Sequence, residues 1–319
     1  MKIKSFAKIN LGLEIIRKRA DGYHDIKTLF QWISLADTLE FREIASPGII
    51  LEGNDPSIPW DENNLIYKAA ALLRDRYGAG RGIGIRVDKK IPAGRGLAGG
   101  SSNAAAALLA LDKFWSLGLA KSELTEIGKT LGADVAYFFE GGLCLGEGRG
   151  DALTPLPELP GFPLVLAIPP FPVATAGIYA SLLPSSLTSD GKDSRINGFL
   201  ETRAFGFLEN RLEETIFSLY PRVKEYKSLF RDQGAELSLV TGSGSAVYGL
   251  FRDRARAEGC LAVAKERGAA VLVETLTREQ GWSAFEVGAS PSGKAADFGS
   301  AIRGFESSRP SLDIKKIRR

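Results

Sequence analysis

The sequence predicts an α/β (α+β) protein with two domains. Its 319 residues suggest about two domains at ~150 residues each. A segment with four prolines in ten residues, 154–163, divides the chain. Beyond it we read a strand, a helix, two strands, a helix and a strand, which is the split βαβ, or ferredoxin-like, order. We therefore expect one domain over residues 1–158, a second over 159–288, and a tail over 289–319.

The first domain reads as strands followed by helices around a glycine-rich loop. Residues 1–60 contain short apolar segments broken by Gly or Asp, which predict several short strands. Residues 61–77 have a helical apolar stripe, with Asp61 and Glu62 suited to its first turn. Residues 81–90 alternate like a half-buried strand, and 121–131 predict a short helix that ends at Gly132.

The second domain shows the pattern behind the ferredoxin-like prediction. Residues 163–169 read as a strand, a helix begins after Ala174, and a polar loop covers 184–197. Helices near 210–233 precede strands around 235–241 and 245–251, and a helix over 253–267 leads to a strand over 269–276.

Composition excludes several classes of protein. The apolar share is 44% and the net charge only +3, from 41 basic and 38 acidic residues, which does not suggest a nucleic-acid partner. No apolar run approaches the ~20 residues of a membrane span, and no signal peptide is evident. Cys144 and Cys260 form no CxxC pair, so we expect inert buried thiols and a cytoplasmic location. The single histidine, His24, excludes a multi-histidine zinc site, so acid–base chemistry should fall to a carboxylate or a lysine.

The most informative stretch is GRGLAGGSS, residues 94–102. It joins a strand to an Ala-rich helix, so its backbone N–H groups and the helix dipole favour binding of an anion such as phosphate. A dinucleotide fingerprint is disfavoured, because Pro92 interrupts the approach and no acidic residue lies near position 119. A Walker A loop is excluded, because Gly100 stands where its lysine would be.

These segments resemble a known family. IPAGRGLAGGSSNAA, residues 91–105, is similar to the second signature of the GHMP kinases, and the resemblance extends over about residues 1–277. It includes FAKINLGLEI, RADGYHDIKTLFQWISLADTLEF, DENNLIYKAA, LGADVAYFFEGG, GEGRGDALTPL, ENRLEE and VTGSGSAVYG, in the family's order. The resemblance implies a kinase that uses ATP with Mg²⁺. Its acceptor would be a small alcohol carrying a cytidine diphosphate group, in isoprenoid synthesis that does not pass through mevalonate.

The resemblance also assigns an ATP-binding set. The loop would wrap the phosphates, Asn64 would lie near the adenine or ribose, and Ser101 or Ser102 would lie near Mg²⁺. We expect a negative φ at Ala98, which replaces a glycine of many members, and Arg95 places a bulky cation in the loop. The loop residues are Pro92, Ala93, Gly94, Arg95, Gly96, Leu97, Ala98, Gly99, Gly100, Ser101 and Ser102.

The same resemblance makes Asp134 the general base and places Lys8 beside it. Read alone, Asp134 is a turn or helix cap and Lys8 a solvated strand lysine. Next to a phosphate loop the catalytic interpretation is favoured, because transfer to a hydroxyl needs a carboxylate to orient and accept its proton. The resemblance implies that Tyr23 and His24 hold the cytosine and that Tyr179 supplies an aromatic face on its other side. The full acceptor-binding set that it implies is Asn10, Tyr23, His24, Tyr179, Gly242, Ser243 and Gly244.

Two alternatives remain open. Another kinase of the family, for homoserine or mevalonate, is disfavoured by Tyr23, His24 and Tyr179, because those substrates have no base to stack. A non-catalytic nucleotide-binding protein on the same fold is disfavoured because both Lys8 and Asp134 are present. We expect a monomer or weak homodimer.

Residues 289–319 lie outside the resemblance and show no periodic apolar pattern. We interpret them as a disordered extension, and as a hypothesis they are a translated transfer-RNA gene. Gly304–Ser307 can be encoded by GGG-TTC-GAG-TCC, which contains a T-arm sequence. A nucleotide sequence that cannot fold as a cloverleaf would contradict this hypothesis.

Overall fold

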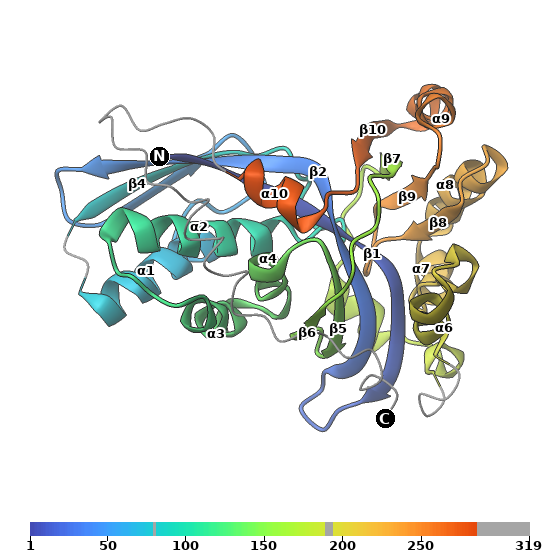
Figure 1. Cartoon of the computed structure of the whole chain (residues 1–319), viewed down its shortest axis with the longest axis horizontal. Helices are drawn as coiled ribbons and strands as arrows, with labels where there is room; N and C mark the ends of the chain where they lie inside the picture. Colours follow the sequence, from blue (N-terminus) through green and yellow to red (C-terminus); the bar gives the residue numbers. More distant parts are fainter. Residues whose placement is uncertain (79–80, 189–193, 286–319) are drawn as a thin grey trace.

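The computed structural model describes residues 1–78, 81–188 and 194–285, and the hypothesis on the 289–319 tail lies outside them. Its first sheet has six strands in the order β3-β4-β2-β5-β6, with β1 paired along β2 (Figure 1). All pairs are antiparallel except β3 with β4. The strands are β1 (Lys2–Lys18), β2 (His24–Ile44), β3 (Ile49–Gly53), β4 (Gly82–Asp88), β5 (Leu143–Gly148) and β6 (Ala152–Pro155).

The short strands expected before residue 45 are wrong, because β1 and β2 each form one long strand. β2 pairs with β5 through residues 26–31 and with β4 through 38–44, so its two halves belong to different parts of the sheet. The β1–β2 register shifts between Phe6 and Lys8 and again between Asn10 and Gly12. Such irregularities re-aim side chains, and these two flank the residues expected in the site.

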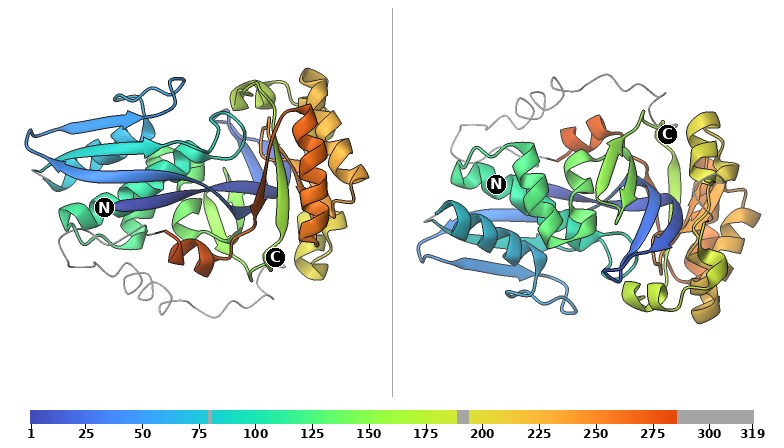
Figure 2. Two further views of the ribbon diagram at one scale, coloured as in Figure 1. Left: turned by 90° about the horizontal axis from the view of Figure 1, so that it is seen from above. Right: turned by 90° about the horizontal axis from the view of Figure 1, so that it is seen from below.

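Helices cover one face of this sheet, as the view from below shows (Figure 2). Apolar residues of α1 and α2, among them Leu73 and Leu108, pack with strand residues such as Ile85 and Phe41 in one core cluster. These helices are α1 (Leu65–Tyr77), α2 (Gly99–Trp115), α3 (Lys121–Leu131), the 3₁₀ helix η1 (Ala133–Val135) and α4 (Tyr137–Glu140).

The second sheet has four antiparallel strands in the order β10-β7-β9-β8. This is the predicted ferredoxin-like order, so the expected α/β fold class is confirmed. Its strands are β7 (Pro163–Ile168), β8 (Leu237–Val240), β9 (Val247–Leu250) and β10 (Ala269–Glu274). The helices after residue 163 are α5 (Thr175–Ala180), η2 (Pro184–Ser186), α6 (Arg195–Thr202), η3 (Phe205–Phe207), α7 (Glu213–Leu219), α8 (Pro221–Asp232), α9 (Arg254–Arg267) and α10 (Arg278–Ser283).

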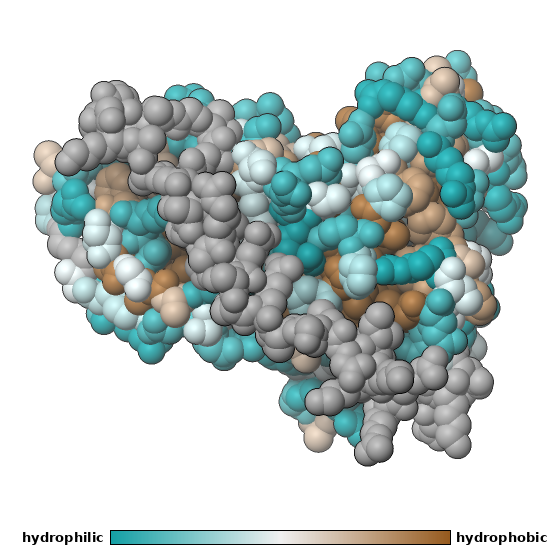
Figure 3. Space-filling view, viewed as in Figure 1, coloured by the Kyte–Doolittle hydropathy of each residue, from teal (hydrophilic) through white to brown (hydrophobic). Residues whose placement is uncertain are grey.

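Each face of the second sheet has its own core. On one face Val165 and Val247 pack against α8 and α9 residues, including Phe230 and Cys260. The space-filling view shows hydrophilic residues over the outer edge formed by α8 and α9, with hydrophobic ones in the recessed area beside them (Figure 3). On the other face Leu166 and Tyr248 join Ile9 and Leu29 of the first sheet, along with other apolar side chains, in one cluster.

Several boundaries differ from the sequence predictions. The first helix begins at Leu65 with Asn64 as its N-cap, so Asp61 and Glu62 precede it. The polar loop ends earlier than expected, because Ser194 caps α6 and accepts the N–H of Asn197. No helix in the described ranges is both long and apolar enough to cross a membrane. The domain boundary near residue 158 stays a prediction.

Candidate active site

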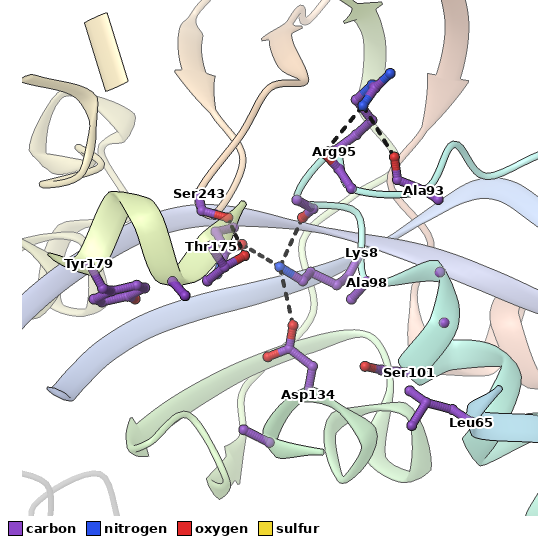
Figure 4. A pocket seen from close by; sticks show the side chains of 18 of the residues that line it. Lys8, Leu65, Ala93, Arg95, Ala98, Ser101, Asp134, Thr175, Tyr179 and Ser243 are labelled. Atoms are coloured by element: carbon purple, nitrogen blue, oxygen red, sulfur yellow. Dashed lines mark hydrogen bonds and ion pairs between the residues drawn. The ribbon is translucent and has the colours of Figure 1, made fainter. Parts of the chain in front are cut away.

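One cavity of about 1140 Å³ lies between the phosphate loop, β1, η1, α5 and the loop after β8. Figure 4 shows Lys8 and Asp134 between Tyr179 on one side and Leu65 and Ser101 on the other. Most residues expected in the site line this cavity. The exceptions are Leu97, Ser102 and Gly244, which do not line it.

Lys8 lies at the centre of the cavity with its side chain only 5% exposed. Its ammonium donates hydrogen bonds to Asn10 Oδ1 at 2.7 Å and to the Gly96 carbonyl at 3.0 Å. It also lies 5.5 Å from the centre of the Phe30 ring. Burial lowers the pKa of Lys8, and the carboxylate of Asp134 opposes this shift. A desolvated cation in this position can stabilise negative charge that develops on a nearby oxygen.

Asp134 comes from η1, directly after the end of α3. Its carboxylate lies 3.7 Å from the Lys8 ammonium, and its side chain is 36% exposed toward the cavity. Both residues line the cavity, but Asp134 presents much more of its side chain to a ligand than Lys8 does. This arrangement can hold an acceptor hydroxyl and take its proton.

The phosphate loop leads into the first turn of α2, which begins at the buried residue Gly99. Gly94 and Gly96 have φ values of +66° and +75°, which glycine adopts without strain. A Cβ on Gly96 would lie 2.0 Å from the Thr241 carbonyl oxygen, so only glycine allows the loop to approach this closely. The negative φ expected at Ala98 is wrong: Ala98 is the helix N-cap in the left-handed region, at φ +53°.

The two candidate serines occupy different environments. The Ser102 hydroxyl donates to the Phe6 carbonyl and accepts from Ser5, both at 2.6 Å, and the residue is 2% exposed. Ser101 lines the cavity, and its hydroxyl lies on the side of the loop that faces Asp134 (Figure 4). Within the described ranges no three His, Cys, Asp or Glu side chains form a metal-binding group.

Asn64 lines the cavity, but its side chain has a structural role. The amide oxygen accepts the Ile66 N–H at 2.9 Å, and the amide nitrogen donates to the Pro59 carbonyl at 2.8 Å. Asn64 therefore holds the segment before α1 against the start of that helix. Trp60 and Leu65 also line this end of the cavity and provide apolar surface for a nucleobase.

The opposite end of the cavity is aromatic. Tyr23 is 59% exposed, and the Arg149 guanidinium lies 5.7 Å from its ring centre. His24 and Tyr179 have ring centres 5.2 Å apart, which is the spacing of a direct ring contact, so no base fits between these two rings. Burial, with a smaller effect from Lys18, lowers the pKa of His24, which favours a neutral imidazole.

The loop after β8 is fixed by a buried asparagine. The Asn210 amide donates to the carbonyls of Val240 and Gly242, both at 2.8 Å. On the cavity side the hydroxyls of Ser243 and Thr175 are 2.8 Å apart (Figure 4). This contact joins the loop to the start of α5.

Sequence reasoning missed several cavity residues. The Lys89 ammonium, beside the phosphate loop, is buried and lies 2.8 Å from the Asp37 carboxylate. Lys89 and Lys90 are adjacent in the sequence, and nothing in the sequence indicates that Lys89 is buried while Lys90 is exposed. Arg149 lies in the recognised GEGRGD segment, and its cationic side chain among glycines was a usable signal. Trp60 comes from a loop without any recognised pattern.

Comparisons with known proteins identify the family of this chain. The family model described as GHMP kinases N terminal domain matches residues 64–142, and the GHMP kinases C terminal model matches 199–270. A 4-diphosphocytidyl-2-C-methyl-D-erythritol kinase from Bacillus cereus (strain B4264) is 37% identical over 257 residues, covering 80% of this chain and 89% of that relative. The kinase of the same name from Shouchella clausii (strain KSM-K16) is 38% identical over 258 residues, covering 80% and 86%.

A solved structure extends the agreement to three dimensions. The crystal structure of a 4-(cytidine 5'-diphospho)-2C-methyl-D-erythritol kinase superposes with a TM-score of 0.75 at 34% identity. The match covers 86% of this chain and 99% of that one. The chain therefore belongs to the GHMP kinase family.

Proposed function

We propose that this kinase transfers the γ-phosphate of ATP to the 2-hydroxyl of 4-diphosphocytidyl-2-C-methyl-D-erythritol, in the non-mevalonate route to isoprenoids. The observation that carries the proposal is the placement of Lys8 and Asp134 between two different ends of one cavity. One end has the phosphate loop with Trp60 and Leu65, and the other has Tyr23 and Tyr179. This layout suits a nucleotide donor and a second, base-bearing substrate that meet in the middle.

The chemistry needs a carboxylate to orient the attacking hydroxyl and accept its proton, together with cations that stabilise the transferring phosphoryl group. Asp134 is exposed to the cavity and can take the proton, while Lys8 holds its positive charge beside the attacking oxygen. The glycines of the phosphate loop and the positive end of α2 bind the donor phosphates. Tyr23 and His24 hold the cytosine, and Tyr179, whose ring contacts that of His24, lies at the edge of that site.

Mg²⁺ fits the oxygen donors present. It would be held mainly by phosphate oxygens and water, and it would neutralise phosphate charge. Ser101 lines the cavity, whereas the Ser102 hydroxyl already bonds to the Phe6 carbonyl. We therefore infer that the side chain nearest the ion is that of Ser101 and not that of Ser102.

An ATP-consumption assay against a panel of alcohols tests the proposal. The panel contains the cytidylylated methylerythritol, mevalonate and homoserine, with the Asp134→Asn variant as the matched inactive control. Turnover with the cytidyl substrate at least ~100-fold above the other two is the expected result. Preference for mevalonate or homoserine would show a different kinase of the family, and no turnover with any alcohol would favour a nucleotide-binding protein without catalysis.

We further propose that the enzyme is cytoplasmic and works as a monomer or weak homodimer, without nucleic-acid or membrane partners. The balanced charge and the two free, buried cysteines support this assignment. Light scattering across a dilution series measures the oligomeric state, and a mass that stays at twice the chain mass on dilution would contradict it.

A further inference from the structure

Thr241 connects three segments that are far apart in the sequence. The residue lies directly after β8 and is 0% exposed. Its hydroxyl accepts the backbone N–H of Asn10 at 3.1 Å and donates to the Gly96 carbonyl at 3.1 Å. One oxygen atom therefore ties β1 and the phosphate loop to the loop after β8.

The Thr241 hydroxyl and the Lys8 ammonium share their acceptors. Lys8 Nζ donates to Asn10 Oδ1 and to the Gly96 carbonyl, and these are the two oxygens within reach of Thr241 Oγ1, at 3.4 Å and 3.1 Å. Because the ammonium sits at the end of a flexible chain, its position depends on where these acceptors are held. Thr241 holds one of them, Gly96, directly and holds the backbone of the other, Asn10.

The orientation of the Asn10 amide is also fixed. Its Nδ2 donates to the Thr28 hydroxyl at 2.7 Å, and that hydroxyl donates to the Gly12 carbonyl at 2.7 Å. The amide oxygen therefore has to face Lys8. The phosphate loop is tied to β1 on one side of Gly96, where the Lys8 N–H donates to the Leu97 carbonyl at 3.2 Å. The Gly96 carbonyl itself accepts only side-chain donors in this cluster, from Lys8 and Thr241.

We propose that Thr241 is a positioning residue for phosphoryl transfer: its buried hydroxyl fixes the Gly96 carbonyl against β1 and thereby sets the position of the Lys8 ammonium relative to Asp134. The inference rests on the proposed kinase activity. Without the hydroxyl, the buried Asn10 N–H loses its partner and Gly96 can move relative to Lys8. Small displacements of catalytic groups can reduce rates by about 10²-fold.

The test compares Thr241→Val, which replaces the hydroxyl with a methyl group, with Thr241→Ser, which keeps the hydroxyl. Thr241→Val should lower kcat by ~10–100-fold while KM for ATP stays within ~3-fold, and Thr241→Ser should retain kcat within ~3-fold. In a Lys8→Met background the Val substitution should change kcat by less than ~3-fold, because its effect acts through Lys8. If Thr241→Val does not fold, Thr241→Ala takes its place.

The matched control is Thr215→Val on α7. Thr215 is also buried, and its hydroxyl has no hydrogen-bond partner among the residues that the structure describes. The same chemical change there should leave kcat within ~2-fold. Three results would each overturn the inference. The first is an equal kcat in the Thr241→Val and wild-type enzymes, and the second is an equal decrease of kcat in Thr241→Ser and Thr241→Val. The third is a decrease of kcat by Thr241→Val that is just as large in the Lys8→Met background.

A readout without turnover separates this inference from the proposed function. Acetic anhydride labels deprotonated, accessible amines, so the labelling of Lys8 relative to the exposed Lys90 reports how tightly Lys8 is held. The ratio should rise several-fold in Thr241→Val and stay unchanged in Thr215→Val. A wild type that does not phosphorylate the cytidyl substrate overturns the proposed function, whereas an unchanged labelling ratio overturns the role of Thr241.

Discussion

The ammonium of Lys8 lies 3.7 Å from the carboxylate of Asp134, close enough for an ion pair but longer than a hydrogen bond. An acceptor hydroxyl can therefore bond to both groups at once, giving its proton to Asp134 and keeping its oxygen beside Lys8.

Asp134→Asn keeps the size of the side chain and removes its basicity and charge. Because base catalysis contributes about 10²–10⁴-fold, kcat should fall by roughly that factor. ADP affinity, measured by calorimetry, should change little because the phosphate loop is intact. Near-normal turnover would show that Asp134 is not the base.

Lys8 and Asp134 should act on the same proton transfer. Lys8→Ala should also lower kcat, and the double variant should resemble the worse single variant, because groups that act together are not additive. Rate constants for the four enzymes in the cycle measure this directly. Losses that multiply would assign the two residues to separate steps.

His24 should matter for the acceptor and not for ATP. Because stacking on a base is worth ~1–3 kcal/mol, His24→Ala should raise KM for the cytidyl substrate roughly tenfold and leave KM for ATP within ~2-fold. Steady-state kinetics with each substrate varied in turn provide the measurement. Equal effects on both substrates would place the cytosine elsewhere.

The pH dependence of that KM has a predicted sign. Burial lowers the pKa of His24, so the unfolded chain takes up this proton at a higher pH than the folded protein. The contribution of His24 to the free energy of unfolding is therefore constant above about pH 6.5 and falls as the pH drops below it. In the folded enzyme the same lowered pKa keeps the imidazole of His24 neutral down to about pH 6.5 and below. We therefore expect KM for the acceptor to be flat from about pH 8 to 6.5 and to rise only below that range, with no such rise in His24→Ala.

Ala98 stands in a left-handed conformation that costs an L-residue ~1–2 kcal/mol. Ala98→Gly should therefore stabilise the protein by up to about 1 kcal/mol, even though glycine gains entropy in the unfolded chain. Ala262→Gly, at an exposed position in the middle of α9, is the control and should destabilise by about 0.5–1 kcal/mol. Urea unfolding curves of the two variants should shift in opposite directions, and a parallel shift would contradict the strain argument.

Arg95 is a half-buried cation in the phosphate loop that pairs with no carboxylate in the described ranges. It donates to the carbonyls of Ala93 and Gly94 at 3.3 and 3.5 Å (Figure 4). An unpaired charge so near the donor phosphates raises the local positive potential, so Arg95→Ala should raise KM for ATP ~3–10-fold at low salt and less at high salt. Lys90→Ala, which removes an exposed neighbouring charge outside the cavity, should have a smaller effect.

The sequence was informative where chemistry is local to a short segment. The phosphate loop could be recognised from its own glycines and the helix behind it. Lys8 and Asp134 were placed beside it by the resemblance to the GHMP kinases, because read alone they are a strand lysine and a cap. The ferredoxin-like order after residue 163 was predictable because each strand and helix there has its own boundaries.

Other features depend on contacts distant in the sequence. β1 is buried along both faces, so it lacks the alternating pattern that would have revealed one long strand. The left-handed conformation of Ala98 and the role of Thr241 depend on contacts between loops. Thr241 and Gly96, which are hydrogen-bonded, are more than 140 residues apart in the sequence. Lys89 and Trp60 reach the cavity from segments whose residues are unremarkable when read in order.

One apolar cluster joins Ile9 and Leu29 of the first sheet to Leu166 and Tyr248 of the second. Because of this shared core, the two sheets should unfold together when the protein is heated. On that face β1 and β2 supply much of the apolar cover of the second sheet, alongside α6 residues such as Phe199. An isolated C-terminal half would expose a broad apolar surface and would tend to aggregate. Scanning calorimetry of the intact chain should then show a single cooperative transition, with the calorimetric and van't Hoff enthalpies equal.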